Sequence, residues 1–254
     1  MKVIGVVPAR MASSRFPGKP LHPICGMPMV EHVYRRAMIF ARWDGLYLAT
    51  CDREIAALGK VKGWPTIMTS DRHIRCLDRV AEAAEKCGQA LGVDDVVVCV
   101  QGDEPMLHPD MIAASIKPLE EDSSVSCTVL AMQIVDEAQF RNPDTVKIIH
   151  DMKGDVLYTS RAPVPYCKVL TPAIEARRIY GIFAFRWGFL KTFTAMPESP
   201  LELVESCDSN RIMDNGYRQR IAPYPFQPSF SVDSPQDIQQ VEAHMRKDSL
   251  WGQY

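Results

Sequence analysis

The sequence lacks both of the glycine-rich loops that most often bind nucleotides. No Gly-x-Gly-x-x-Gly turn follows the apolar run at residues 3–7, which argues against a dinucleotide cofactor and against a doubly wound reductase. The chain also has no P-loop: Gly18-Lys19 resembles the end of that motif, but Ser13 stands where its first glycine belongs. Pro20 replaces the Ser or Thr that would hold magnesium there. The usual glycine-rich signatures are therefore excluded.

Other absences exclude whole classes of protein. The net charge is −2 and no run of five or more basic residues occurs, so we expect no nucleic-acid partner. The longest apolar stretches fall far short of the ~18 residues that a membrane helix needs, so we expect no membrane partner. The first residues do not resemble a signal peptide. The eight cysteines include no Cys-x-x-Cys pair, so we expect free thiols in the cytoplasm rather than disulfides or structural zinc.

The composition is that of an ordinary globular protein, with 46% hydrophobic and 24% charged residues among 254. In the first half, short apolar runs alternate with segments of helical periodicity. Strands are predicted at residues 3–7, 46–50, 66–68 and 96–100, and helices at 28–41, 53–60 and 77–87. This alternation predicts an α/β fold with a mostly parallel, Rossmann-like sheet and helices on both faces.

The second half has a different pattern. It predicts strands at residues 125–130, 146–150, 156–158 and 179–185 and helices that begin at 187 and span 201–212. Three prolines make residues 163–176 an excursion from the sheet. Ser234 and Pro235 are typical of the N-cap and first position of a last helix, and we expect fraying after about Lys247.

The most informative segment is the loop after the first strand, which carries Arg10, Arg15 and Lys19 within ten residues. Open α/β sheets bind ligands at this edge, and three cations suit a triphosphate better than a monoanion. Ser13 and Ser14 are small enough for the backbone to approach a ligand closely. A solvated basic turn would have the same composition, so both interpretations stay open at this point.

Asp103 is the strongest candidate acid, because it follows the buried run at residues 96–100 and stands beside Gly102. Magnesium prefers one or two carboxylates together with phosphate oxygens, so Asp103 next to a phosphate-binding loop predicts a magnesium ligand. Capping of the turn is the alternative. Asp233 is a second candidate, although an Asp before Ser-Pro is common helix-capping chemistry. Glu104 is a weaker candidate, because the pleat points it away from Asp103.

Several motifs resemble those of the 3-deoxy-manno-octulosonate cytidylyltransferase family. The longest is Pro-Ala-Arg-x-x-Ser-Ser-Arg-Phe-Pro-Gly-Lys-Pro-Leu at residues 8–21, and Val-Gln-Gly-Asp-Glu-Pro-Met follows at 100–106. Further matches occur in family order at residues 142–147, 157–162, 181–189, 199–205 and 232–237. Together these motifs cover nearly the whole chain.

The resemblance implies a single nucleotidyltransferase domain over residues 1–254, of the nucleotide-diphospho-sugar transferase type. A smaller inserted lobe, at about residues 150–200, is expected to mediate a homodimer. The implied activity is the Mg²⁺-dependent transfer of CMP from CTP to a small acidic acceptor such as 3-deoxy-manno-octulosonate (Kdo) or a related acid, with release of pyrophosphate.

The resemblance also assigns site residues. Those expected on the nucleotide are Pro8, Ala9, Arg10, Ser13, Ser14, Arg15, Lys19 and Gln101. Those expected on the acceptor are Arg75, Arg79, Gln101, Arg161, Tyr180 and Glu205. Arg10, Lys19 and Asp103 are expected to be catalytic, and Asp103 and Asp233 to bind magnesium.

The chain departs from the family on the acceptor side. The family pattern His-x-Ser-Gly-Thr-Asp/Glu-Arg keeps both ends here, but its centre has become Arg75-Cys76-Leu77. A histidine before the Gly-Ile strand is replaced by Ile179 with Tyr180. We therefore expect the use of CTP to be retained, while an acceptor other than Kdo stays open. Arg75 would suit an added anionic group, as in a different ulosonic acid or a phosphonate. A surface arginine at a helix start is the alternative.

Two further interpretations compete with this one. A sugar-phosphate nucleotidyltransferase that uses UTP or dTTP generally has a glycine-rich opening that this chain lacks. A non-catalytic CTP-binding protein would have little need for both Asp103 and Asp233 as metal ligands. Both interpretations are weaker than cytidylyl transfer.

Overall fold

The computed structural model describes residues 1–13 and 15–254, so the nucleotide contact predicted for Ser14 lies outside the described residues. The strands are β1 (Val3–Ala9), β2 (Pro23–Ile24), β3 (Met27–Pro28), β4 (Gly45–Thr50), β5 (Thr66–Met68), β6 (Val96–Val100), β7 (Cys127–Gln133), β8 (Lys147–His150), β9 (Val156–Ser160), β10 (Arg177–Arg186) and β11 (Arg220–Tyr224). The α-helices are α1 (Met29–Met38), α2 (Arg53–Lys62), α3 (Cys76–Lys86), α4 (Pro109–Glu121), α5 (Glu137–Arg141), α6 (Trp187–Ala195), α7 (Pro200–Glu205), α8 (Asp208–Asp214) and α9 (Asp237–Met245). Two short 3-10 helices are η1 (Lys19–Leu21) and η2 (Pro172–Ile174).

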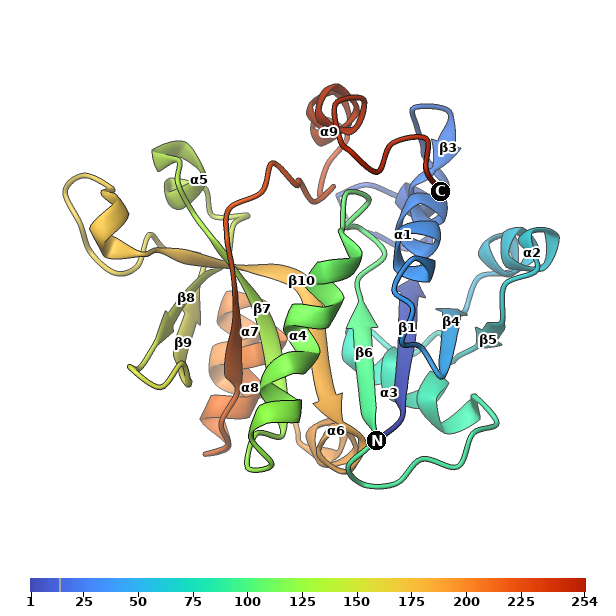
Figure 1. Ribbon diagram of the computed structural model, residues 1–254, viewed down its shortest axis with the longest axis horizontal. Helices are drawn as coiled ribbons and strands as arrows, with labels where there is room; N and C mark the ends of the chain where they lie inside the picture. The colour runs from blue at the N-terminus through green and yellow to red at the C-terminus, as the bar shows by residue number, and fades with distance from the viewer. Residues whose placement is uncertain (14) are drawn as a thin grey trace.

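Over the described residues, nine strands form one sheet, whose main path has the order β11-β7-β10-β6-β1-β4-β5. On this path β10 pairs antiparallel with both of its neighbours, and the remaining pairs are parallel. All strands of the path except β10 therefore run in one direction. β8 pairs with β10, and β9 extends the sheet beyond β8 (Figure 1). The prediction of a mostly parallel α/β sheet is confirmed.

Helices cover both faces of the sheet because its central strands are apolar on both sides. On β6, the side chains of Val96, Val98 and Val100 join the core under α1, α2 and α4, while Val97 and Cys99 join the core under α3, α6 and α8. Figure 1 shows α1 and α4 over the face of the sheet that is nearer the viewer. Strands buried on both faces carry continuous apolar runs, which is the pattern seen at residues 96–100.

The register of β1 and β6 determines where the functional loops leave the sheet. The two strands pair in parallel, with Val3 opposite Val96 and Val6 opposite Cys99. β1 extends to Ala9, two residues beyond its predicted end, and β6 ends at Val100. The loops that begin at Arg10 and Gln101 therefore start at the same edge of the sheet.

A smaller lobe lies at one side of the sheet, where Figure 1 shows β8, β9 and α5. It has an apolar cluster of its own, formed by Ile134, Phe140 and Ala176. The segment at residues 163–176 leaves the sheet as predicted, and its single element of regular secondary structure is η2. The predicted limits of the lobe, at about residues 150 and 200, stay a prediction.

Some elements differ from the sequence-based expectation. The segment expected as one helix over 201–212 is two helices, α7 and α8, because Ser206 adopts a left-handed φ of 50° between them. The last helix begins at Asp237 rather than Pro235. Ser234 does not cap it. Instead, the Ser234 backbone N–H and hydroxyl both donate to the Asp237 carboxylate, at 2.7 and 3.0 Å.

The described helices include none that is long and apolar enough to cross a membrane. All eight cysteines are present as free thiols.

The expected fraying after Lys247 is wrong. The Asp248 carboxylate pairs with the Arg36 guanidinium of α1, and its other oxygen lies 3.1 Å from Nε2 of His108. Arg36 is fully buried, and its guanidinium also stacks over the Tyr254 ring at 4.8 Å. Trp251 packs with Ile24 and Met245 in a further apolar cluster. The C-terminal segment is therefore anchored to α1.

We predict that Asp248→Ala lowers the free energy of unfolding by about 3–5 kcal/mol, because it leaves the buried Arg36 charge unpaired. Burial alone would raise the pKa of Asp248, but the His108 hydrogen bond and the Arg36 charge hold this pKa below its usual range. The stabilisation is thus complete above the unfolded pKa of ~4 and is lost as the pH falls below it. Denaturant unfolding between pH 3 and 7 measures both effects. If Asp248→Ala has the same free energy of unfolding as the wild type at every pH, the ion pair between Asp248 and Arg36 does not stabilise the fold.

Candidate functional site

Two adjoining cavities open at the edge of the sheet where β1 and β6 end. The first, of about 600 Å³, is lined by the loop after β1, by residues 101–103 and by Asp233. The second, of about 740 Å³, extends from Asp103 toward β10, α5 and the start of α8. Both are lined by Arg75, Gln101 and Arg161, so the two cavities share one boundary.

The loop after β1 is held in shape by its own backbone. The Gly18 N–H donates to the Met11 carbonyl at 3.0 Å, and Gly18 has a left-handed φ of 77° that favours glycine. The Met11 N–H donates to the Asp52 carboxylate at 2.7 Å, which ties the loop to the end of β4. The predicted nucleotide residues that line the first cavity are Pro8, Ala9, Arg10, Ser13, Arg15, Lys19 and Gln101. The structure therefore brings together the part of this set that it describes.

Asp103 lies opposite Lys19, whose Nζ is 3.0 Å from Oδ2 of Asp103 and 2.6 Å from the Val232 carbonyl. The turn that carries Asp103 packs directly on β1: a Cβ atom at Gly102 would lie 2.6 Å from the Pro8 carbonyl oxygen. Only glycine fits there. This contact places Asp103 against the basic loop, as the sequence predicted.

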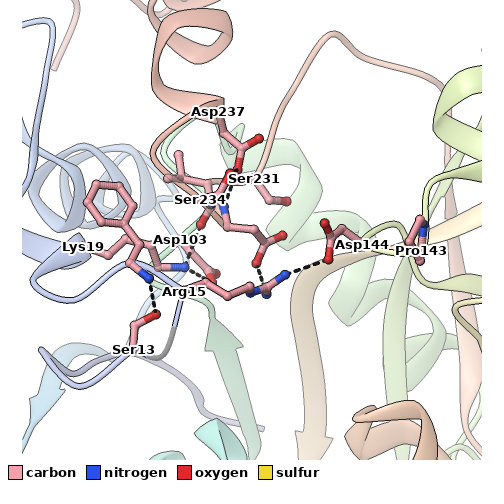
Figure 2. A network of polar contacts seen from close by, with 12 residues as sticks. Ser13, Arg15, Lys19, Asp103, Pro143, Asp144, Ser231, Ser234 and Asp237 are labelled. Carbon is pink, nitrogen blue, oxygen red and sulfur yellow. Dashed lines mark hydrogen bonds and ion pairs between the residues drawn. The ribbon is translucent and has the colours of Figure 1, made fainter.

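Asp233 reaches the same place from the far end of the chain. The Arg15 guanidinium contacts Asp233 and Asp144 at 2.7 Å each. Figure 2 shows the Arg15 side chain extending from the loop toward Asp144. The Asp233 N–H donates to Asp237 at 2.8 Å, which fixes the turn. The pKa of Asp233 is raised, first by burial and second by the negative charge of Asp103.

Asp103 and Asp233 could hold a divalent cation. Both carboxylates are about one-third exposed, at 32% and 30%, and both line the first cavity. A hard cation prefers carboxylate oxygens and would relieve the repulsion between them. Residues 1–13 and 15–254 contain no group of three or more His, Cys, Asp or Glu side chains that could hold a metal by itself, so these two aspartates would need ligands from the substrate or from water. The donor set therefore fits magnesium with phosphate oxygens and waters as its other ligands.

Arg75 lines both cavities but is also paired with protein carboxylates, and its predicted contact with the acceptor stays a prediction. Its guanidinium lies 3.4 Å from Glu198 and 3.8 Å from both Glu202 and Asp208, and its side chain is only 19% exposed. Next to it, Cys76 accepts a hydrogen bond from Gln101 at 3.2 Å. These three acidic side chains meet here, and the pKa of Asp208 rises to about 6, mainly through burial. Arg75 and Arg211 together offset part of this negative charge, and Arg211 pairs with Glu202 at 2.6 Å.

Tyr180 does not line either cavity, so its predicted contact with the acceptor is wrong. The ring is fully buried among the core residues under α4, and its hydroxyl lies 2.5 Å from that of Ser229. The alternation of side chains along β10 explains the error. Ile179, Gly181 and Phe183 line the second cavity, whereas Tyr180 packs with Ile182 and Ala184 in the core on the opposite face.

Arg161 and Glu205 act as a pair, but only Arg161 lines the cavities. The Glu205 carboxylate accepts hydrogen bonds from the Arg161 N–H at 2.8 Å and from the hydroxyls of Tyr158 and Ser160 at 2.8 and 2.7 Å. Burial opposes the charged form, yet these bonds lower the pKa of Glu205. Glu205 therefore supports Arg161. It lines neither cavity, which does not agree with the direct contact to the acceptor that was predicted for it.

Arg79 lines the first cavity, but its guanidinium is largely buried and donates to the Thr69 hydroxyl and to the His73 carbonyl. Arg10 also donates to this carbonyl, at 3.5 Å. Arg79 thus holds the segment that carries His73 beside Arg10.

Sequence reasoning assigned no role to Asp144 or Lys147, and it ranked Glu104 only as a weaker candidate. Asp144 lies between Arg15 and Arg161, with 2.7 and 3.9 Å to their guanidinium groups. Lys147 is fully buried, and its Nζ donates to the carbonyls of Asn142, Thr145 and Arg161 at 2.5–2.8 Å. Glu104 is buried beneath the second cavity. Asn142 and Lys147 belong to a motif noted in the sequence, which was the available signal for this loop.

Comparison with known proteins gives a consistent result. A family model described as "Cytidylyltransferase" matches residues 4–221. Proteins named 3-deoxy-manno-octulosonate cytidylyltransferase from Syntrophus aciditrophicus and Nitratidesulfovibrio vulgaris strain DP4 are 38% and 42% identical over 240 and 248 residues. These matches cover 94% and 96% of this chain and 96% of each relative.

A solved structure of CMP:2-keto-3-deoxy-manno-octonic acid synthetase, complexed with CTP, superposes with a TM-score of 0.85 at 33% identity. The match covers 97% of this chain and 99% of that chain. A 4-diphosphocytidyl-2C-methyl-D-erythritol synthase, with a TM-score of 0.62 and 14% identity, shares the fold alone. The chain is a CTP-dependent nucleotidyltransferase and belongs to the cytidylyltransferase family, with the 3-deoxy-manno-octulosonate cytidylyltransferases as its near relatives.

Proposed function

We propose that this cytidylyltransferase transfers CMP from CTP to Kdo, releases pyrophosphate and requires Mg²⁺. The observation that carries the proposal is the meeting of Arg10, Arg15 and Lys19 with Asp103 and Asp233 around one cavity. Basic side chains that bind phosphates next to carboxylates that hold a cation are what nucleotidyl transfer needs. The names of the relatives support Kdo as the acceptor.

The charges around the first cavity support the need for magnesium. The cavity is lined by six cations, the three of the loop together with Arg75, Arg79 and Arg161, and by three aspartates, Asp103, Asp144 and Asp233. Arg15 and Lys19 pair with Asp233 and Asp103, so part of the positive charge that would face a triphosphate is compensated by the two proposed metal ligands. A divalent cation held by Asp103 and Asp233 would supply the missing positive charge on the phosphate oxygens.

In the proposed reaction, the hydroxyl oxygen of the acceptor attacks the α-phosphorus of CTP. The new O–P bond forms as the bond to the leaving pyrophosphate breaks, and the hydroxyl proton is released. The chain contributes position and charge rather than a covalent intermediate. Lys19 and Arg10 hold phosphate oxygens, while Gln101 and Arg161, on the boundary between the cavities, orient the acceptor toward the nucleotide.

Kdo is favoured over a phosphonate or another acid as the acceptor. The physical reason to consider an added anion was the guanidinium of Arg75, but Glu198, Glu202 and Asp208 already surround it. A charge that the protein itself compensates adds little attraction for a further anion. A non-catalytic role is also disfavoured, because the basic loop and both aspartates meet in one place.

We expect Kdo to be the best acceptor when pyrophosphate release is measured with CTP, Mg²⁺ and a panel of acidic sugars and phosphonates. Arg75→Ser should keep this order of acceptors, since the residue pairs inside the protein. If another acid surpasses Kdo with the wild type, the acceptor assignment is wrong, and a reversal of that preference in Arg75→Ser would show that Arg75 selects the acceptor.

We expect Asp103→Ala to lower turnover by at least ~10²-fold, the usual loss when one stabiliser of transition-state charge is removed. Asp94→Ala is the matched control, because Asp94 is an exposed aspartate at the opposite end of β6 and lines neither cavity. Near-normal turnover of a folded Asp103→Ala enzyme would refute the metal-binding role.

We further propose that the chain forms a homodimer through the surface that β9 of the lobe and α7 present. Large apolar side chains are exposed there on β9 and α7, including Leu157 and Val204, which is 80% exposed. Sedimentation equilibrium should give twice the 28.6 kDa of one chain. Val204→Glu should shift the protein toward monomer, whereas Val61→Glu, equally exposed at 81% on the distant α2, should not. A monomeric wild type would contradict the proposal.

A further inference from the structure

Glu104 is a buried acid that the proposed reaction does not use. It follows Asp103 in the chain, yet its side chain turns away from the basic loop and is only 3% exposed. A glutamate is rarely buried to this degree unless it is paired. Its Oε2 atom has no hydrogen-bond partner among the described residues, and burial, with the nearby charge of Asp103, raises its pKa to about 7. The environment of its other oxygen, Oε1, is therefore informative.

The Oε1 atom of Glu104 accepts two hydrogen bonds from segments far apart in the sequence. One comes from the Gly181 N–H of β10 at 3.0 Å, and the other from the Ser231 hydroxyl at 2.8 Å. The Gly181 carbonyl also accepts from the Gln101 N–H at 2.8 Å. Both backbone groups of Gly181 are thus bound to residues 101–104.

An irregularity in β10 makes the Gly181 N–H available. The pairing with β7 shifts register between Tyr180 and Phe183, so Gly181 stands in a bulge. Glycine is required at this point, because a Cβ atom would lie 2.6 Å from Oε1 of Gln101 and 2.8 Å from Cγ of Glu104. The Glu104 side chain therefore packs tightly against the wall of the second cavity.

The second donor, Ser231, belongs to the segment that carries Asp233. Two other hydrogen bonds hold this segment: the Val232 N–H donates to the Asp103 carbonyl at 3.0 Å, and Lys19 donates to the Val232 carbonyl at 2.6 Å. Both of these come from the loops of the first cavity. Ser229, at the start of this segment, contacts β10 directly through Arg178 and Tyr180, at 2.9 and 2.5 Å. Glu104 adds a connection to β10 at Ser231, two residues from Asp233, so it links the position of Asp233 to the wall of the second cavity.

We propose that Glu104 is a positioning residue for the reaction: by accepting from Gly181 and Ser231, its carboxylate sets Asp233 opposite Asp103. This inference rests on the proposed function, because it takes these two aspartates as the cation ligands. Residues that orient metal ligands affect metal affinity or activity by ~10–100-fold.

The test compares Glu104→Ala, Glu104→Gln and Ser231→Ala in the full chain. Manganese binding in the presence of CTP, followed by electron paramagnetic resonance, is measured beside kcat and the KM values for CTP and acceptor. We expect Glu104→Ala to weaken Mn²⁺ binding ~10-fold and to lower kcat by at least ~10-fold. Glu104→Gln, whose amide oxygen can accept both hydrogen bonds, should stay within ~3-fold of wild type. Ser231→Ala should weaken Mn²⁺ binding while leaving the Gly181 bond intact.

Ser115→Ala is the control for a merely structural effect. Ser115 is a fully buried serine on α4 whose hydroxyl donates to the Ile112 carbonyl, away from both cavities, so this variant should lower the melting temperature without changing Mn²⁺ binding. Should Glu104→Ala not fold, Ser231→Ala carries the test. Asp103→Ala and Asp233→Ala should both weaken Mn²⁺ binding. If they do, wild-type Mn²⁺ binding in Ser231→Ala and in any folded Glu104→Ala would overturn the inference. If these aspartate variants also bind Mn²⁺ normally, the proposed metal site itself is wrong.

Discussion

The parallel pairing of β1 with β6 is the constraint on which the site depends. It brings the loop after Ala9 and the turn after Val100 to the same edge of the sheet, and the close contact between Gly102 and Pro8 removes any space between them. Three cations and one aspartate thereby face one cavity before any other part of the chain contributes. The remaining parts of the site, Asp144, Arg161 and Asp233, are brought to this edge by the lobe and by the C-terminal segment.

Much of this arrangement could be predicted because it is local. β5 and β6 have their predicted limits, since a short β-branched run bounded by polar residues has few other solutions. The elements that were missed have ambiguous sequences. α4 contains Pro118 in its interior, and β11 carries Pro223 at the edge of the sheet. Proline is unfavourable in most helix interiors and central strands, so both segments lacked a clear periodic signal.

The errors at the site arise from contacts between distant residues. The pairing of Arg75 was not predicted, because its carboxylate partners, at positions 198–208, follow more than a hundred residues later. The carboxylate of Glu205 belongs to the same constellation as Arg161, but nothing local shows that it is consumed by backbone and hydroxyl donors. For Tyr180 the signal was present, because strand alternation alone places it opposite Ile179. Local chemistry thus identifies which residues matter, whereas tertiary pairing decides which of them face a ligand.

The C-terminal segment shows why tertiary pairing matters most for Asp233. An aspartate before Ser-Pro is chemically an ordinary helix cap, but no side chain caps the N-terminus of α9 here. The Asp237 carboxylate instead accepts from the backbone N–H groups of Asp233 and Ser234, while the carboxylate of Asp233 faces Arg15 and the cavity. Three further sets of contacts hold this segment in place. Glu104 and Lys19 bind residues 231–232, and α9 packs against Ile24. The third is the buried ion pair between Asp248 and Arg36. Each of these contacts joins the last quarter of the chain to its first half. An aspartate held in this way has a defined position relative to Asp103 although 130 residues separate them in sequence, and a pair of carboxylates with defined separation is what a small hard cation requires.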